Sequence, residues 1–146
     1  MDKAVRILGV IICLIGLMSV RFFETKLFYD PILSYFHGDF LGRKLPEFDT
    51  QKHLISIALR YALNAILSLG IIYCIFKNKS YLRWSVIIFI IGLIILLPLY
   101  QWFIDTDFSL SPRLGFYTRR FLIQPMLGIV LILALFYVEK TKKSAQ

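Results

Sequence analysis

The stretch "LISIALRYALNAILSLGIIYCIF", from Leu54 to Phe76, decides the fold of this chain. Its one charged side chain is Arg60. A helix rises about 1.5 Å per residue, so about 20 mostly apolar residues cross the hydrocarbon core of a bilayer, which is roughly 30 Å thick. Because the backbone finds no water there, such a segment is expected to be a transmembrane helix.

Three other apolar runs have a similar length, and the sequence therefore predicts four transmembrane helices, at about residues 5–23, 54–76, 84–104 and 121–138. The chain is 58 % hydrophobic and 18 % charged, whereas a soluble domain is about half apolar and about a quarter charged. We expect residues 1–146 to form a single membrane domain, an all-α integral membrane four-helix bundle. The first run lacks a small-residue cleavage site, so it is expected to remain as a helix rather than to be removed as a signal peptide.

The loop between the first two spans contains "YDPILSYFHG", which predicts a short helix. Asp30 suits the N-cap of that helix and Pro31 suits its first position. The residues that follow can turn one apolar face to the same side; they are Ile32, Leu33, Tyr35 and Phe36. A helix of this kind between two spans is expected to lie in the interface plane of the bilayer.

The net charge of +8 lies mostly beside the apolar runs, where it indicates orientation and contact with anionic headgroups. No nucleic-acid-binding motif accompanies it, so we predict no nucleic-acid partner. Four spans place both termini on one side, and equal numbers of Lys and Arg fall on the two sides. The positive residues of the terminal side stand in shorter loops with fewer acids, which favours cytoplasmic termini.

A polar stripe runs along the second span. Ser56, Arg60, Asn64 and Ser68 recur at every fourth residue, so they share one side of the helix. Lipid would penalise that side, and we expect it to face other helices or a water-filled cavity. The stripe has two interpretations: hydrogen bonds between helices, or a functional cation inside the membrane.

Charged residues also gather where the spans leave the membrane on the side opposite the termini. If these ends converge, they form a cluster that either holds the loops together or recognises a carboxylate, a phosphate or a peptide through paired arginines. The candidate functional or interaction cluster comprises Arg21, Glu24, Arg60, Asn64, Asp105, Asp107, Arg119, Arg120 and Gln124.

The sequence does not favour an enzyme. A thiol nucleophile needs a neighbouring histidine or cation, but Cys74 and His53 stand at opposite ends of one span, about 30 Å apart by helical rise. Cys13 lies near the middle of the first span. No catalytic, metal-binding or nucleotide-binding motif is present, so we predict no catalytic residue, no metal site and no cofactor. Two similar halves, expected for many transporters, are not visible either.

The stretches "RFFETKLFYDP", "LPEFD", "RYALNAILSL" and "RRFLIQP" resemble the exosortase F system-associated proteins, and the likeness covers nearly the whole chain. Exosortases are membrane cysteine enzymes that process the C-terminal sorting tails of exported proteins. Because this chain lacks a suitably placed Cys, Arg and His set, the resemblance implies a multi-pass accessory in the bacterial inner membrane. Such an accessory would assemble with exosortase F or present substrate tails. The alternatives are a membrane protein that handles lipid or envelope polymer, or a small transporter.

Overall fold

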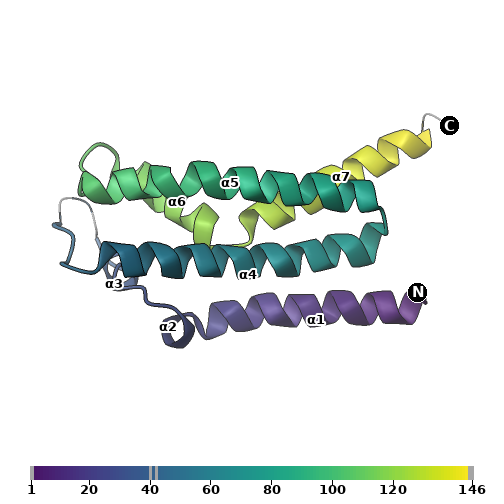
Figure 1. Cartoon of the computed structure of the whole chain (residues 1–146), viewed down its shortest axis with the longest axis horizontal. Helices are drawn as coiled ribbons and strands as arrows, with labels where there is room; N and C mark the ends of the chain where they lie inside the picture. Colours follow the sequence, from purple (N-terminus) through teal and green to yellow (C-terminus); the bar gives the residue numbers. More distant parts are fainter. Residues whose placement is uncertain (1, 40, 42, 145–146) are drawn as a thin grey trace.

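The computed structural model describes residues 2–39, 41 and 43–144, and these residues form helices and connecting loops without a strand. The all-α prediction is therefore confirmed. The helices are α1 (Lys3–Phe22), α2 (Glu24–Leu27), α3 (Leu33–Phe36), α4 (Thr50–Phe76), α5 (Lys79–Asp105), α6 (Pro112–Ile123) and α7 (Met126–Ser144). The long helices lie along one axis, and both termini lie at the same end (Figure 1). We call this the terminal end and the opposite one the loop end.

Three helices, α1, α4 and α5, are long and apolar enough to cross a membrane. They contain the expected spans 54–76 and 84–104 and nearly all of 5–23. Helices α6 and α7 pass the same test only as a pair, and the pair is bent by 70°.

The span expected at 121–138 is not one helix, which corrects the prediction. Helix α6 ends at Ile123, and α7 begins at Met126. Pro125 has no N–H to donate and disfavours the helical conformation in the residue before it. Gln124 is accordingly extended, with φ −107° and ψ 149°. Pro125 therefore breaks the expected span between α6 and α7.

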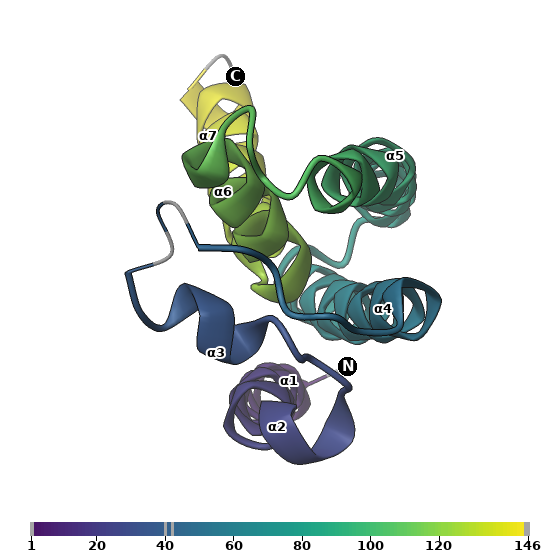
Figure 2. The ribbon, with the colours of Figure 1, turned by 90° about the vertical axis from the view of Figure 1, so that its left-hand side faces the viewer.

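Helix α4 is the central helix of the molecule and contacts α1, α5, α6 and α7. Figure 2 looks along the bundle from the loop end and shows α4 between α1 and α5. All four stripe residues, Ser56, Arg60, Asn64 and Ser68, are buried. Of the two surroundings expected for this stripe, other helices or a water-filled cavity, the structure shows burial among neighbouring segments.

Helices α1 and α4 pack closely in an antiparallel register that small residues make possible. A Cβ placed on Gly9 would lie 2.8 Å from the Cys74 sulfur, and one placed on Gly70 would lie 2.8 Å from the Cys13 sulfur. Each sulfur therefore occupies the space that the opposite glycine leaves. Gly16 meets Leu67 in the same register.

Arg6 fixes this helix pair at the terminal end. Its Nε donates to the carbonyl of Cys74 at 2.8 Å, and its Nη2 donates to the carbonyl of Ile75. These carbonyls belong to the last turn of α4, which has no helical partners for them and which favours a cation.

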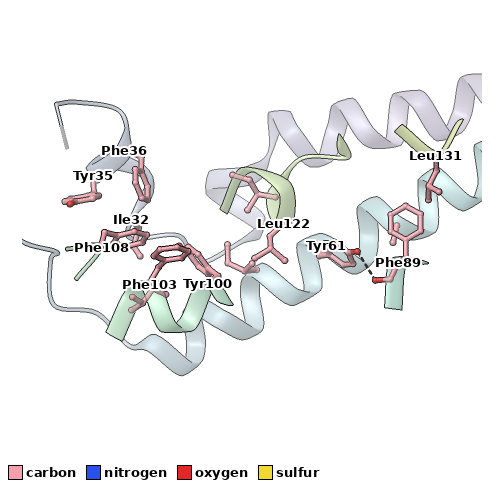
Figure 3. Packing of buried hydrophobic residues seen from close by; sticks show 14 of the residues in the cluster. Ile32, Tyr35, Phe36, Tyr61, Phe89, Tyr100, Phe103, Phe108, Leu122 and Leu131 are labelled. Atoms are coloured by element: carbon pink, nitrogen blue, oxygen red, sulfur yellow. Dashed lines mark hydrogen bonds between the residues drawn. The ribbon is translucent and has the colours of Figure 1, made fainter. Parts of the chain in front are cut away.

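The largest part of the core lies at the loop end. Ile32 and Phe36 pack with Tyr100, Phe103 and Phe108, and all five side chains are at most 9 % exposed (Figure 3). The rings of Phe36 and Phe108 meet edge to face at 5.3 Å between centroids. The loops are thus part of the core.

The short helix in the first loop differs from the prediction. It comprises Leu33–Phe36, and its N-cap is Ile32 rather than Asp30. Its side chains Tyr35 and Phe36 pack against aromatic partners from α5 and the following loop. A second short helix, Glu24–Leu27, follows α1.

Candidate functional site

Four charged side chains from distant segments meet at the loop end. Glu24 is the first residue of α2, Arg60 lies on the inner side of α4, and Arg119 lies in α6. Asp30 belongs to the loop before α3. Glu24, just beyond the end of α1, meets Arg60 of α4. We call Glu24, Asp30, Arg60 and Arg119 the ion cluster.

Direct ion pairs connect the members of the ion cluster. Arg60 donates to Glu24, and Arg119 donates to Asp30. A longer contact of 3.7 Å joins Arg60 Nη1 to Asp30 Oδ2. The side chains of Asp30, Arg60 and Arg119 are at most 4 % exposed, and that of Glu24 is 13 % exposed. Two positive and two negative charges therefore neutralise one another away from water.

Aromatic rings complete the surroundings of the two arginines. The guanidinium of Arg60 lies 5.7 Å from the ring centroid of Phe28, and that of Arg119 lies 5.4 Å from that of Phe36. Both distances are typical of cation–π contacts. The Nε atoms of both arginines are buried without a hydrogen-bond partner within the described part of the chain. Packing and ion pairing thus hold these cations.

His53 extends the ion cluster towards α5. Its Nδ1 lies 3.4 Å from the carbonyl of Tyr29 and 4.0 Å from Asp30 Oδ1. Its Nε2 lies 3.1 Å from the hydroxyl of Tyr100. Since Nδ1 faces acceptors, a neutral His53 carries its proton there, and Nε2 accepts from Tyr100. This hydrogen-bonded chain fixes α4, α5 and the first loop to one another.

Asn64 connects α4 to the break between α6 and α7. Its Nδ2 donates to the carbonyl of Ile123 at 3.0 Å. That carbonyl stands in the last turn of α6, where helical donors are missing because the chain turns away. A side-chain amide at this position therefore satisfies a buried backbone group.

The structure brings some of the predicted cluster residues together and leaves others apart. Arg21 joins the ion cluster from outside, with its Nη1 2.8 Å from Glu24 Oε2. Arg120 is exposed and donates from Nε to Gln124 Oε1 at 3.0 Å. Asp105 and Asp107 are exposed, and no salt bridge joins them to the arginines in the described part of the chain.

Two members of this site were not among the predicted cluster residues. Asp30 precedes a proline and has the sequence signature of a helix cap, and this local pattern concealed its long-range pairing. His53 stands at the start of a span, where a histidine is unremarkable. Arg60 and Arg119 are both expected near the same end of the spans. Because each buried cation needs an anionic partner, the sequence indicates a second carboxylate besides Glu24.

An open groove lies next to the ion cluster, where α1 faces the α6–α7 break. Its polar half has a volume of about 390 Å³, and its apolar half has a volume of about 420 Å³. Both halves share Arg21, Ile123 and Gln124. The polar half is further lined by Arg119, Arg120 and His37, and the apolar half by Leu17, Met18, Met126 and Ile129.

The described residues include no group of three or more His, Cys, Asp or Glu side chains placed to hold a metal ion. The sulfurs of Cys13 and Cys74 instead fill space between α1 and α4. No family model, curated protein or solved structure matches the chain.

Proposed function

We propose that the chain is a non-enzymatic accessory of an exosortase F-type protein-sorting system, a multi-pass protein of the bacterial inner membrane with both termini in the cytoplasm. It assembles with the sortase or presents substrate tails to it. The observation that carries this proposal is the internal pairing of the ion cluster. Charged side chains that could have served chemistry on a substrate are buried and neutralise one another, so their role is to fix the loop end as a rigid surface.

The choice of partner rests on sequence. The stretches that resemble the exosortase F system-associated proteins include "RFFETKLFYDP" and "RRFLIQP". These two stretches contain Glu24, Asp30 and Arg119, which are three of the four residues of the ion cluster. A shared loop-end architecture would explain why these segments are alike.

Surfaces for a membrane partner are available on the outer helices. Leu8, Ile12 and Ile15 on α1 are 57–59 % exposed and do not line the groove. Ile91 and Ile95 on α5 are exposed by 50 % and 58 %. Apolar surface inside a bilayer packs equally well against lipid or another helix, so the partner has to be found by experiment.

Photo-crosslinking in intact cells tests the proposal. A photoreactive residue is placed at Ile12 on α1, with Ile91 on α5 and Leu133 on α7 as comparisons, because all three are exposed. We expect the sortase, or a substrate bearing a sorting tail, to be captured from one of these faces. Deleting the gene is expected to impair tail processing. Processing that continues unchanged in the deletion strain, with no sortase or substrate captured, would overturn the proposal.

A further inference from the structure

We propose that the groove at the α6–α7 break binds one anionic glycerophospholipid. Its phosphate lies between Arg21 and Arg120, and one acyl chain follows the apolar half of the groove between α1 and α7. This inference concerns a ligand of the chain itself and does not depend on the sortase. The lipid would be retained when the protein is purified alone.

The polar half of the groove carries an uncompensated positive charge. Among the residues that the structure describes, three arginines and His37 line it, and no carboxylate does. Asp30 pairs with Arg119, whereas Glu24 is shared between Arg21 and the buried Arg60. Arg120 instead donates to a neutral amide oxygen, that of Gln124. A phosphodiester carries one negative charge, and the guanidinium fork fits phosphate oxygens in pairs.

The apolar half of the groove lies at the depth of an acyl chain. Helix α1 has 20 residues and so is about 30 Å long, which matches the hydrocarbon core and places Arg21 at the level of the headgroups. Leu17 lies one turn deeper, about 6 Å below Arg21. Met126 and Ile129 follow the break on the facing side. The groove thus changes from arginine-lined to apolar along the bilayer normal, in the same direction in which a lipid changes from headgroup to acyl chain.

The groove persists because neither wall can close it. Helix α1 is fixed to α4 by Arg6 at the terminal end and by the pair Glu24–Arg60 at the loop end. Helix α6 is fixed to α4 by Asn64 and turns away from α7 at Pro125. Because the groove stays open towards the bilayer, we expect a lipid molecule to fill it.

Retention of lipid by the purified protein is the test. The protein is exchanged from detergent into nanodiscs or micelles with phosphatidylglycerol, phosphatidylcholine or an equal mixture, and bound lipid is counted by native mass spectrometry. We expect one retained phosphatidylglycerol in preference to phosphatidylcholine. Arg120→Gln should weaken retention about tenfold or more, the loss expected for a hydrogen bond to a charged group. The matched control is Arg113→Gln, which removes an exposed arginine of the same helix outside the groove.

A second pair of variants tests the apolar half without touching the charges. Ile129→Trp fills the groove at a position that is 53 % exposed, and Leu133→Trp adds the same ring at an exposed position of α7 outside the groove. We expect only Ile129→Trp to lower retention, with melting temperatures of both variants near that of the wild type. Equal retention of both lipids, or retention unaffected by Arg120→Gln and Ile129→Trp, would overturn the proposal. So would binding of an acidic peptide tail that displaces no lipid yet is lost in Arg120→Gln.

Discussion

Arg60 illustrates what a single residue contributes in this molecule. It lies 16 residues before the end of α4, about 24 Å along the helix from that end, and its side chain meets Glu24 at the loop end. A cation buried among helices is tolerated when it is paired. Its partners Glu24 and Asp30 come from the first loop, so this one residue ties a loop to the centre of the bundle.

Removing one member of the pair Glu24–Arg60 should destabilise the protein more than removing both. Arg60→Met leaves Glu24 with only the exposed Arg21 as a partner, and Glu24→Leu leaves Arg60 with only its longer contact to Asp30. Each is expected to cost about 3–5 kcal/mol, whereas the double variant should cost clearly less than the sum. The free energy of unfolding in mixed micelles is measured for the wild type, the two single variants and the double variant.

Arg21→Met is the control for this double-mutant comparison. The side chain of Arg21 also pairs with Glu24, but it is 55 % exposed. Its effect should stay within about 1 kcal/mol, as for other exposed ion pairs. Additive effects of Arg60→Met and Glu24→Leu would contradict the pairing.

Asn64 should matter through the backbone group that it satisfies. Asn64→Ala leaves the buried carbonyl of Ile123 without its donor, and the expected loss of stability is about 1–3 kcal/mol. Gln51→Ala changes an exposed amide of the same helix and should be nearly neutral. Thermal unfolding of both variants in detergent measures the difference, and equal melting temperatures would exclude the role given to Asn64.

Sequence predicted the polar side of α4 because residues four apart share one face of any helix. It did not predict the partners of that side. Asp30 pairs with Arg60 and Arg119, which lie 30 and 89 positions further along the chain. The local sequence before a proline carries no information about such distant contacts.

At the scale of the elements, hydropathy predicted α1, α4 and α5 because length and apolar character alone define a span. It missed the break in the last span, because an average over the segment hides one proline. The register of α1 against α4 also had only a faint signal, the small residues Gly9, Cys13 and Gly16 on one side of the helix.

Cysteine crosslinking checks that register. In a Cys74→Ala background, Gly70→Cys places a thiol against Cys13, because a Cβ at residue 70 would lie 2.8 Å from its sulfur. Mild oxidation should then form a disulfide between residue 70 and Cys13. After protease cleavage between α1 and α4, the two fragments should stay joined until a reductant is added. Leu69→Cys shifts the thiol by about 100° around α4 and should not react. A crosslink of similar yield at residue 69 would refute the register.

Pro125→Ala should straighten the bent pair α6–α7. An N–H at residue 125 can complete the helix, which proline prevents. The distance between spin labels at residues 113 and 140 is expected to grow by on the order of 10 Å when the 70° bend is lost. An unchanged distance would mean that Asn64 and the ion cluster hold the bend without the proline.

At the scale of the whole molecule, sequence could predict an all-helical chain with helices long and apolar enough to cross a membrane, but not which helices contact one another. Apolar helices look alike to hydropathy, so the central place of α4 follows only from its polar stripe. The aromatic loops also resemble an interfacial belt in composition. Their burial depends on rings such as Phe36 and Phe108, which are far apart in the sequence.

Both termini lie at one end of the structure, and the charges of the loops predict that this end is cytoplasmic. Fluorescent-protein fusions at either end should therefore fluoresce, and a phosphatase inserted after Gly38 in the first loop should be active, since it would reach the periplasm. The opposite result at all three positions would mean that the protein has the reverse orientation in the membrane. A split pattern would refute the four-span topology.

The order of the ion cluster along the chain bears on how the protein is made. Both carboxylates, Glu24 and Asp30, precede both arginines, Arg60 and Arg119. During synthesis from the N-terminus, each arginine therefore reaches the membrane after an acid that can receive it has already been made. Glu24 and Arg60 belong to the first hairpin, so this hairpin can leave the insertion machinery with its buried Arg60 already paired, and Arg119 closes the assembly last.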